Sequence, residues 1–151
     1  MKIQPGFITC LGLFLLAALL NFSFRPISTC SLEVRIKGAE NADGNLSLLV
    51  FNSKTGFPSD ASKACKYSIV KATGSYQSVV FENLPIGTYA VAVMHDQNGN
   101  GQLDTNLFGI PQEGIGVSNN ALNTFGPPLF EETSFTLNEQ RKVIEITLDY
   151  W

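Results

Sequence analysis

The residues best suited to chemistry form one short segment that is rich in carboxylate and amide side chains, Asp96-Gln97-Asn98-Gly99-Asn100-Gly101-Gln102-Leu103-Asp104. Side-chain oxygens alternate along it at Asp96, Asn98 and Asn100, and the glycine that follows permits a sharp turn. Gln102 would then offer its main-chain carbonyl and Asp104 a second carboxylate. Calcium takes several oxygen ligands at about 2.3–2.6 Å. The segment therefore predicts a calcium-binding loop.

The end of this pattern differs from the helix–loop–helix calcium motif, because Leu107 stands where that motif places a bidentate Glu. The flanking sequence indicates a strand before the loop and an irregular segment after it. Glu113 in that segment is the candidate for the missing carboxylate, and Leu103 is expected to point into the core. The ion would be structural and weakly bound, with a dissociation constant of about 10⁻⁴ to 10⁻³ M. The alternative is a metal-free turn, since Asn-Gly dipeptides favour tight turns.

Three further polar residues are tentative ligand-binding candidates. His95 precedes Asp96, but neighbouring residues of a strand point to opposite faces, so the two do not form a catalytic dyad. Ser118 and Asn119 lie in a later Gly- and Asn-rich segment. They would either line a ligand site or cap their own loop through side-chain hydrogen bonds.

The amino terminus has the pattern of a secretory signal peptide over residues 1–30. Lys2 supplies the positive charge, and residues 7–20 form an apolar run that is shorter than the roughly 20 residues of a membrane-spanning helix. The alternatives are an uncleaved anchor and, because Ile27-Ser28-Thr29-Cys30 loosely resembles a lipid-attachment site, a lipid anchor at the cysteine. We expect export to the periplasm or the cell exterior, and a mature domain at 31–151 without a membrane span.

Charge and cysteine content narrow the choice of partners. The chain has 10 Lys and Arg against 13 Asp and Glu. Removal of Lys2 and Arg25 with the leader would leave eight basic against 13 acidic residues, a net charge near −5, which argues against nucleic acid and anionic lipid as partners.

In an oxidising compartment Cys30 and Cys65 could form a disulfide; the alternative is a buried thiol beside a free or lipidated one.

Alternation of apolar and polar residues predicts strands rather than helices after residue 31. The first strand would bury Leu32, Val34 and Ile36, and residues 41–45 predict a hairpin turn at Asp43-Gly44. Further strands are expected at 46–51, 69–73, 78–81, 88–95, 134–137 and 143–148, with a short helical turn near 60–66. About seven short strands separated by turns predict an all-β, antiparallel β-sandwich.

The segment 105–132 does not alternate in this way. It is rich in Gly, Pro and Asn, yet it carries too many apolar residues for disorder. Long irregular connections in compact domains are usually functional. We therefore expect one long ordered loop that begins at the candidate metal loop and packs against one end of the sandwich. The small residues Ala90 and Ala92 on one face of the 88–95 strand indicate close packing there.

The run from His95 to Gly114, with Leu84-Pro85-Ile86-Gly87-Thr88-Tyr89-Ala90-Val91 before it and Gly126-Pro127-Pro128 after it, resembles the exported bacterial family catalogued as domain of unknown function 2141. The resemblance covers about 32–148. It implies a bacterial envelope protein of one domain, and no established activity or catalytic residue. The strand–turn–strand around Gly87-Thr88-Tyr89 also resembles prealbumin-like and Ig-like sandwich domains.

The expected function is that of an exported envelope module, with structural calcium, that binds or organises an unidentified envelope protein or polymer. The alternative is a hydrolase acting on an envelope polymer, with Glu113, Asp96 or Asp104 as the acid or base. No second motif completes such a site, so no catalytic residue is assigned. The orientation of Glu113 discriminates between the two: toward the 96–104 loop it supports the structural role, and toward an open cleft near His95 it supports the enzyme.

Overall fold

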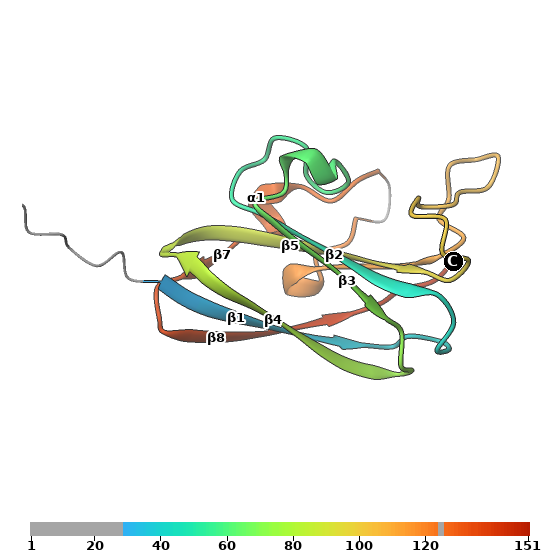
Figure 1. The fold of residues 1–151 in the computed structure, drawn as a ribbon. Helices are drawn as coiled ribbons and strands as arrows, with labels where there is room; N and C mark the ends of the chain where they lie inside the picture. The colour runs from blue at the N-terminus through green and yellow to red at the C-terminus, as the bar shows by residue number, and fades with distance from the viewer. Residues whose placement is uncertain (1–28, 124–125) are drawn as a thin grey trace, which may run out of the picture.

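The computed structural model describes residues 29–123 and 126–151, which form a two-layer β-sandwich (Figure 1). The strands are β1 (Thr29–Lys37), β2 (Asn45–Phe51), β3 (Lys66–Lys71), β4 (Tyr76–Pro85), β5 (Gly87–Asp96), β6 (Gly114–Val117), β7 (Phe135–Leu137) and β8 (Arg141–Thr147). The helices are the short η2 (Ala61–Lys63), η3 (Ser118–Asn120) and α1 (Phe130–Thr133). One sheet has the order β4-β1-β8; the other has the order β3-β2-β5-β6, with β7 also paired to β5. The predicted all-β sandwich is confirmed.

The core lies between the two sheets and is built from the predicted alternating positions. On β1, Leu32, Val34 and Ile36 are buried, and the cluster that contains them also contains Val91 and Val93 of β5. The predicted inward face of the carboxyl-terminal segment is also confirmed, by Ile144, Ile146, Leu148 and Tyr150. Burial of one face of each strand is the main contribution to the stability of such a sandwich.

The connection between β1 and β2 is not the predicted hairpin turn. β1 pairs with β4 and β8, whereas β2 pairs with β3 and β5, so residues 38–44 carry the chain from one sheet to the other. Gly44 does adopt the positive φ expected of its turn dipeptide, at 59°. A Cβ there would lie 1.8 Å from the carbonyl oxygen of Asp96. The glycine thus permits a close crossing of two backbone segments.

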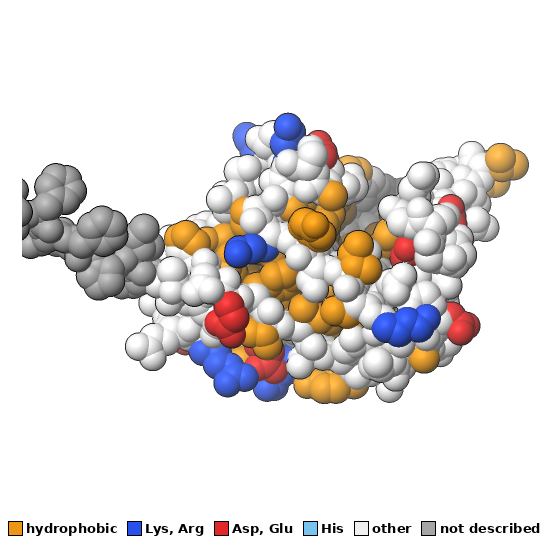
Figure 2. Space-filling model, in the orientation of Figure 1, with side chains coloured by type: hydrophobic (Ala, Val, Ile, Leu, Met, Phe, Trp, Pro, Cys, Tyr) orange, Lys and Arg blue, Asp and Glu red, His pale blue; other side chains and the backbone are white. Residues whose placement is uncertain are grey.

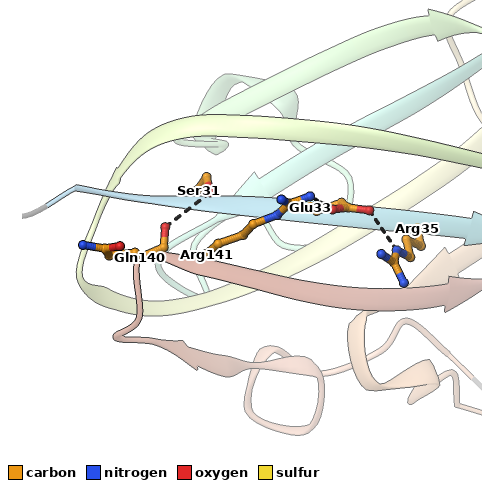
Figure 3. A network of polar contacts seen from close by, with 5 residues as sticks. All are labelled: Ser31, Glu33, Arg35, Gln140 and Arg141. Carbon is orange, nitrogen blue, oxygen red and sulfur yellow. Dashed lines mark hydrogen bonds and ion pairs between the residues drawn. The ribbon is translucent and has the colours of Figure 1, made fainter.

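The smaller sheet is not purely antiparallel, because its central strand β1 runs parallel to β8 (Figure 1). Polar contacts cover the outer face of this pair (Figure 3). Arg35 donates to one oxygen of Glu33 at 2.8 Å, Arg141 donates to the other, and Ser31 Oγ donates to the carbonyl of Gln140 at 3.3 Å. The alternation of β1 therefore places its charged residues on the solvent side, where they bind one another.

The segment 105–132 is more regular than predicted, since it contains β6, η3 and most of α1. Its glycines indicated a loop, but a Cβ at Gly114 would lie 2.3 Å from the ring of Tyr150, and one at Gly116 would lie 2.6 Å from Ile146. These glycines let β6 lie against the carboxyl-terminal residues. The first part of the segment does not pack as predicted: Leu107 and Phe108 are 101% and 88% exposed, on a tip that projects from the sandwich (Figure 1).

The predicted signal peptide lies outside the described residues, except for Thr29 and Cys30, which begin β1.

Cys30 belongs to the buried core, a position that does not suit a lipid-bearing sulfur. Both Cys30 and Cys65 are free thiols, so the predicted disulfide is not formed. The Cys30 side chain is turned inward between the sheets, whereas Cys65 lies at the surface and donates to the carbonyl of Val50 at 3.2 Å. Within 29–123 and 126–151, no helix is both long and apolar enough to cross a bilayer.

Candidate metal centre

The 96–104 loop begins at the carboxyl end of β5. Asp96 is the last residue of that strand, pairs with Asn45 of β2 and is only 3% exposed. Its Oδ1 accepts hydrogen bonds from the main-chain N–H groups of Gly99 at 2.8 Å and Asn100 at 3.1 Å, and its Oδ2 accepts one from Gly101 at 2.9 Å. The loop is thus wound around one buried carboxylate, as the spacing of glycines and Asx residues predicts.

The side chains of Asn98, Asn100 and Asp104 gather at the centre of the loop. The amide of Asn98 donates to Asp104 Oδ2 at 2.5 Å, and the amide of Asn100 donates to the same oxygen at 3.0 Å. The amide oxygens of Asn98 and Asn100 accept main-chain N–H groups from Asn100 and Gln102, at 3.0 and 2.7 Å. The structure therefore brings together the side chains of three predicted metal ligands, while Asp96 contacts the same loop through the loop's main-chain N–H groups. Gln102 contributes its N–H to this network.

Glu113 folds back onto the loop and is 4% exposed. Its Oε1 accepts the N–H of Gln97 at 3.1 Å, and its Oε2 accepts the N–H of Asp104 at 3.2 Å. Gln112 adds a main-chain bond to the carbonyl of Asp104 at 2.8 Å. The carboxylate of Glu113 therefore joins the two ends of the loop. Leu103, predicted to point into the core, is instead 39% exposed.

The loop carries three carboxylates, from Asp96, Asp104 and Glu113, without a cationic side chain. The sequence contains no Lys or Arg between Lys71 and Arg141. The ion pairs within the described residues involve other acidic groups. No group of three or more His, Cys, Asp or Glu side chains is placed to share a metal in the described part of the chain, so any ion there would depend on amide and main-chain oxygens as well.

His95 is fully buried and is not placed to contact a ligand. Its Nε2 lies 2.9 Å from the carbonyl of Asp43, which can only accept, so Nε2 carries a proton. In the neutral ring Nδ1 is then an acceptor, and the hydroxyl of Tyr150 donates to it at 2.6 Å. Burial raises the pKa of Tyr150, which keeps this hydroxyl protonated. His95 therefore joins the crossover at Asp43 to the carboxyl-terminal segment.

Ser118 and Asn119 also make internal contacts. Ser118 is buried, accepts the N–H of Val91 at 2.9 Å and donates to the carbonyl of Thr133 at 2.6 Å. The Asn119 amide donates to the carbonyls of Glu132 and Ser134 at 3.1 and 3.0 Å. Both residues therefore connect η3 to neighbouring segments, in agreement with the capping alternative.

The sequence patterns did not reveal a second feature, a groove on the outer face of the larger sheet that borders the loop. The available signal was that outward positions of several strands are apolar, among them Leu49, Ile69, Met94 and Ile115. An outward sheet face in contact with water usually carries polar residues. Apolar residues at these positions indicate a covered or ligand-binding face.

The fold and the loop together define a class: a β-sandwich domain with an acidic, Asx-rich loop at the end of a central strand. The chain belongs to the family described as uncharacterised proteins conserved in bacteria, DUF2141, which matches residues 34–145. The family resemblance inferred from the loop and its flanking residues is confirmed. No curated protein and no solved structure matches the chain.

Proposed function

We propose that this chain is an exported module of the bacterial envelope whose 96–104 loop binds Ca²⁺, and that it serves as a binding or structural domain. The observation that carries the proposal is the meeting of the Asn98, Asn100 and Asp104 side chains inside a loop whose main chain is wound around Asp96. These side chains supply the hard oxygen ligands that calcium prefers. The ion would stabilise the loop and the segment that follows it.

Electrostatics support the same proposal. Uncompensated carboxylates in a small loop repel one another, and a divalent cation removes that repulsion. In the geometry described, the amide N–H groups of Asn98 and Asn100 point to Asp104 and act as the positive partners. Rotation of each amide by half a turn would replace these donors with oxygens that face the ion. A site with few carboxylates and several amides is expected to be weak, about 10⁻⁴ to 10⁻³ M.

The orientation of Glu113 favours the structural role over the hydrolase alternative. Both of its oxygens accept main-chain N–H groups inside the loop. A general acid or base must reach a substrate proton, and Glu113 is buried with its acceptors in use. Export is supported by the leader pattern of residues 1–30.

Thermal unfolding of the purified full chain, with Ca²⁺ or with chelator, tests the proposal. A ligand that binds only the native state adds about 2.7 kcal/mol at a hundredfold excess over its dissociation constant, which corresponds to a rise of several degrees in Tm. Asp104→Asn keeps the shape of the side chain and should abolish the rise without lowering Tm in chelator. Asp149→Asn removes the same charge at an exposed position and should keep it. No rise in the wild-type chain at about 10 mM Ca²⁺, above the weak limit of such sites, would contradict the proposal.

A further inference from the structure

The groove on the outer face of the larger sheet has a volume of about 720 Å³. Its floor follows from the strand register. Leu49 of β2 stands beside Ala92 of β5, and the next row across β3, β2, β5 and β6 is Ile69, Ser47, Met94 and Ile115. These are the outward positions, because the alternate residues of β2 belong to the core. The volume is that of a typical small-molecule site.

The walls of the groove come from two loops. Pro58, Ser59 and Ala61, at the start of η2, form one side, and residues 99–103 of the candidate metal loop form another. Figure 2 shows hydrophobic side chains gathered between the segment around η2 and the projecting tip. Small side chains at Ser47 and Ala92 leave the middle of the floor open, and both residues are only partly buried. On β5 we expected close packing at the small residues. At Ala92 the small side chain instead leaves room in the groove.

The lining of the groove selects for an uncharged ligand. Asp96 is the only charged residue among the described residues that line it. Both oxygens of Asp96 already accept main-chain N–H groups from residues 99–101. A charged ligand buried here would lose its hydration without gaining an ionic partner, which is costly. The floor is otherwise mostly aliphatic, so burial of hydrocarbon is the available source of affinity.

The shape and the remaining polar atoms narrow the ligand class. The one aromatic residue of the lining is Tyr67, which is 70% exposed on the edge strand β3, so no pair of rings encloses a planar ligand. The floor crosses four strands, about 14 Å at the usual strand spacing. Ser47 is only half-buried and lines the groove, so its hydroxyl can bind one polar group in the ligand.

We propose that this groove binds an uncharged ligand built on a single alkyl chain with one hydroxyl-like polar group. The proposal goes beyond calcium binding and does not depend on it, because the floor is formed by the sheet. The long axis of the ligand would lie across β3, β2, β5 and β6, with its polar group at Ser47.

Isothermal titration calorimetry of the purified full chain with octanol, nonanol and decanol tests the proposal. We expect saturable binding of one molecule per chain, with affinity that rises roughly fourfold per added methylene, the ratio expected for burial of one CH₂. Decanoate, with the same chain and a negative charge, should bind at least tenfold more weakly. The same titrations are made in chelator and in Ca²⁺. Because the floor is formed by the sheet, alcohol binding is expected under both conditions, so a failure of the calcium proposal would leave it unchanged.

Variants of the floor provide the matched controls. Ala92→Leu fills the groove and should reduce the affinity for decanol at least tenfold, whereas Ser78→Leu, at an exposed position of β4 in the other sheet, should leave it unchanged. Ser47→Ala adds no bulk and should weaken decanol several-fold while preserving the increase per methylene. This second variant keeps the test valid if Ala92→Leu perturbs the fold. Uptake that does not saturate, or that is equal in all variants, would overturn the proposal.

A second copy of the chain is the competing occupant, because the exposed tip carries Leu107 and Phe108. If that tip filled the groove of another copy, sedimentation would detect dimers, and replacing both tip residues by Ser would raise the affinity for decanol. That result would contradict an alkyl ligand as the occupant. A monomer whose affinity for decanol does not change with the tip variant supports the proposal.

Discussion

Glu113 Oε2 accepts a hydrogen bond from the main-chain N–H of Asp104 at 3.2 Å, although the two residues lie nine positions apart. The other oxygen of Glu113 accepts the N–H of Gln97, so one buried carboxylate holds both ends of the candidate metal loop. The loop is therefore supported from outside its own sequence.

Glu113→Gln should lower the free energy of unfolding by about 1–3 kcal/mol, because the amide offers one acceptor atom for two partly buried N–H groups. Denaturant unfolding in chelator measures this loss. The same substitution at the exposed Glu82 removes an equal charge and should have little effect. Equal stability of the two variants would show that the bonds from Glu113 do not hold the loop.

Tyr150→Phe should destabilise the domain by roughly 1–3 kcal/mol, since Nδ1 of the buried His95 loses the hydroxyl that donates to it at 2.6 Å. Tyr67→Phe, at a residue 70% exposed, is the control and should be nearly neutral. Thermal unfolding of both variants at neutral pH checks the prediction. A neutral Tyr150→Phe would mean that another group, such as water, satisfies the histidine.

The contribution of Glu33 to stability should depend on pH. Hydrogen bonds from Arg35 and Arg141 lower the pKa of Glu33 below its ordinary value of 4.5. Its contribution is therefore present above pH 4.5 and is lost as the pH falls through the lower pKa of the folded state. Glu33→Gln should shift the denaturant midpoint down at neutral pH and converge with the wild type in acid. Glu145→Gln breaks a more exposed ion pair with Lys37 and should change the midpoint less. A shift for Glu33→Gln that is the same at all pH values would contradict this account.

Gly44→Ala should be strongly destabilising. The φ of 59° alone costs roughly 1–3 kcal/mol for a residue with a Cβ, and the new atom would lie 1.8 Å from the carbonyl oxygen of Asp96. Gly109 has a comparable φ of 77°, but a Cβ there would meet no atom within 4 Å. The Gly109→Ala variant therefore measures the cost of the positive φ alone. The difference between their midpoints in denaturant measures the steric contact. Equal effects would show that the crossing at Asp96 can relax.

Local patterns in the sequence were sufficient for most of the strands, β6 excepted, and for the ligand-like loop. The alternation at Leu32, Val34 and Ile36 specified a buried face, because period-two burial is a property of a single strand. The Asx and Gly spacing of 96–104 indicated a tight loop for the same reason, since the hydrogen bonds to Asp96 join residues at most five positions apart. The family resemblance rested on the run 95–114 and on the flanking segments 84–91 and 126–128.

Contacts between distant segments could not be derived in this way. Asp43-Gly44 has the chemistry of a hairpin turn, yet the pairing partners of β1 and β2 placed it at a crossover between sheets. Gly114 and Gly116 resembled loop residues because the ring of Tyr150 and the side chain of Ile146, which exclude a Cβ, lie far along the chain. Glycine has the same appearance in a sequence whether it provides a positive φ or a close approach.

The sequence by itself determined the β class, the inward face of the main strands and the residues of the candidate calcium loop, since each depends on spacing over a few residues. The tertiary structure alone decided that Glu113 holds the loop, that His95 and Ser118 are internal contacts, and that outward apolar residues of four strands line one groove. These features depend on which strands pair and in which register. Pairing is chosen by the burial of the whole core, which no short segment encodes.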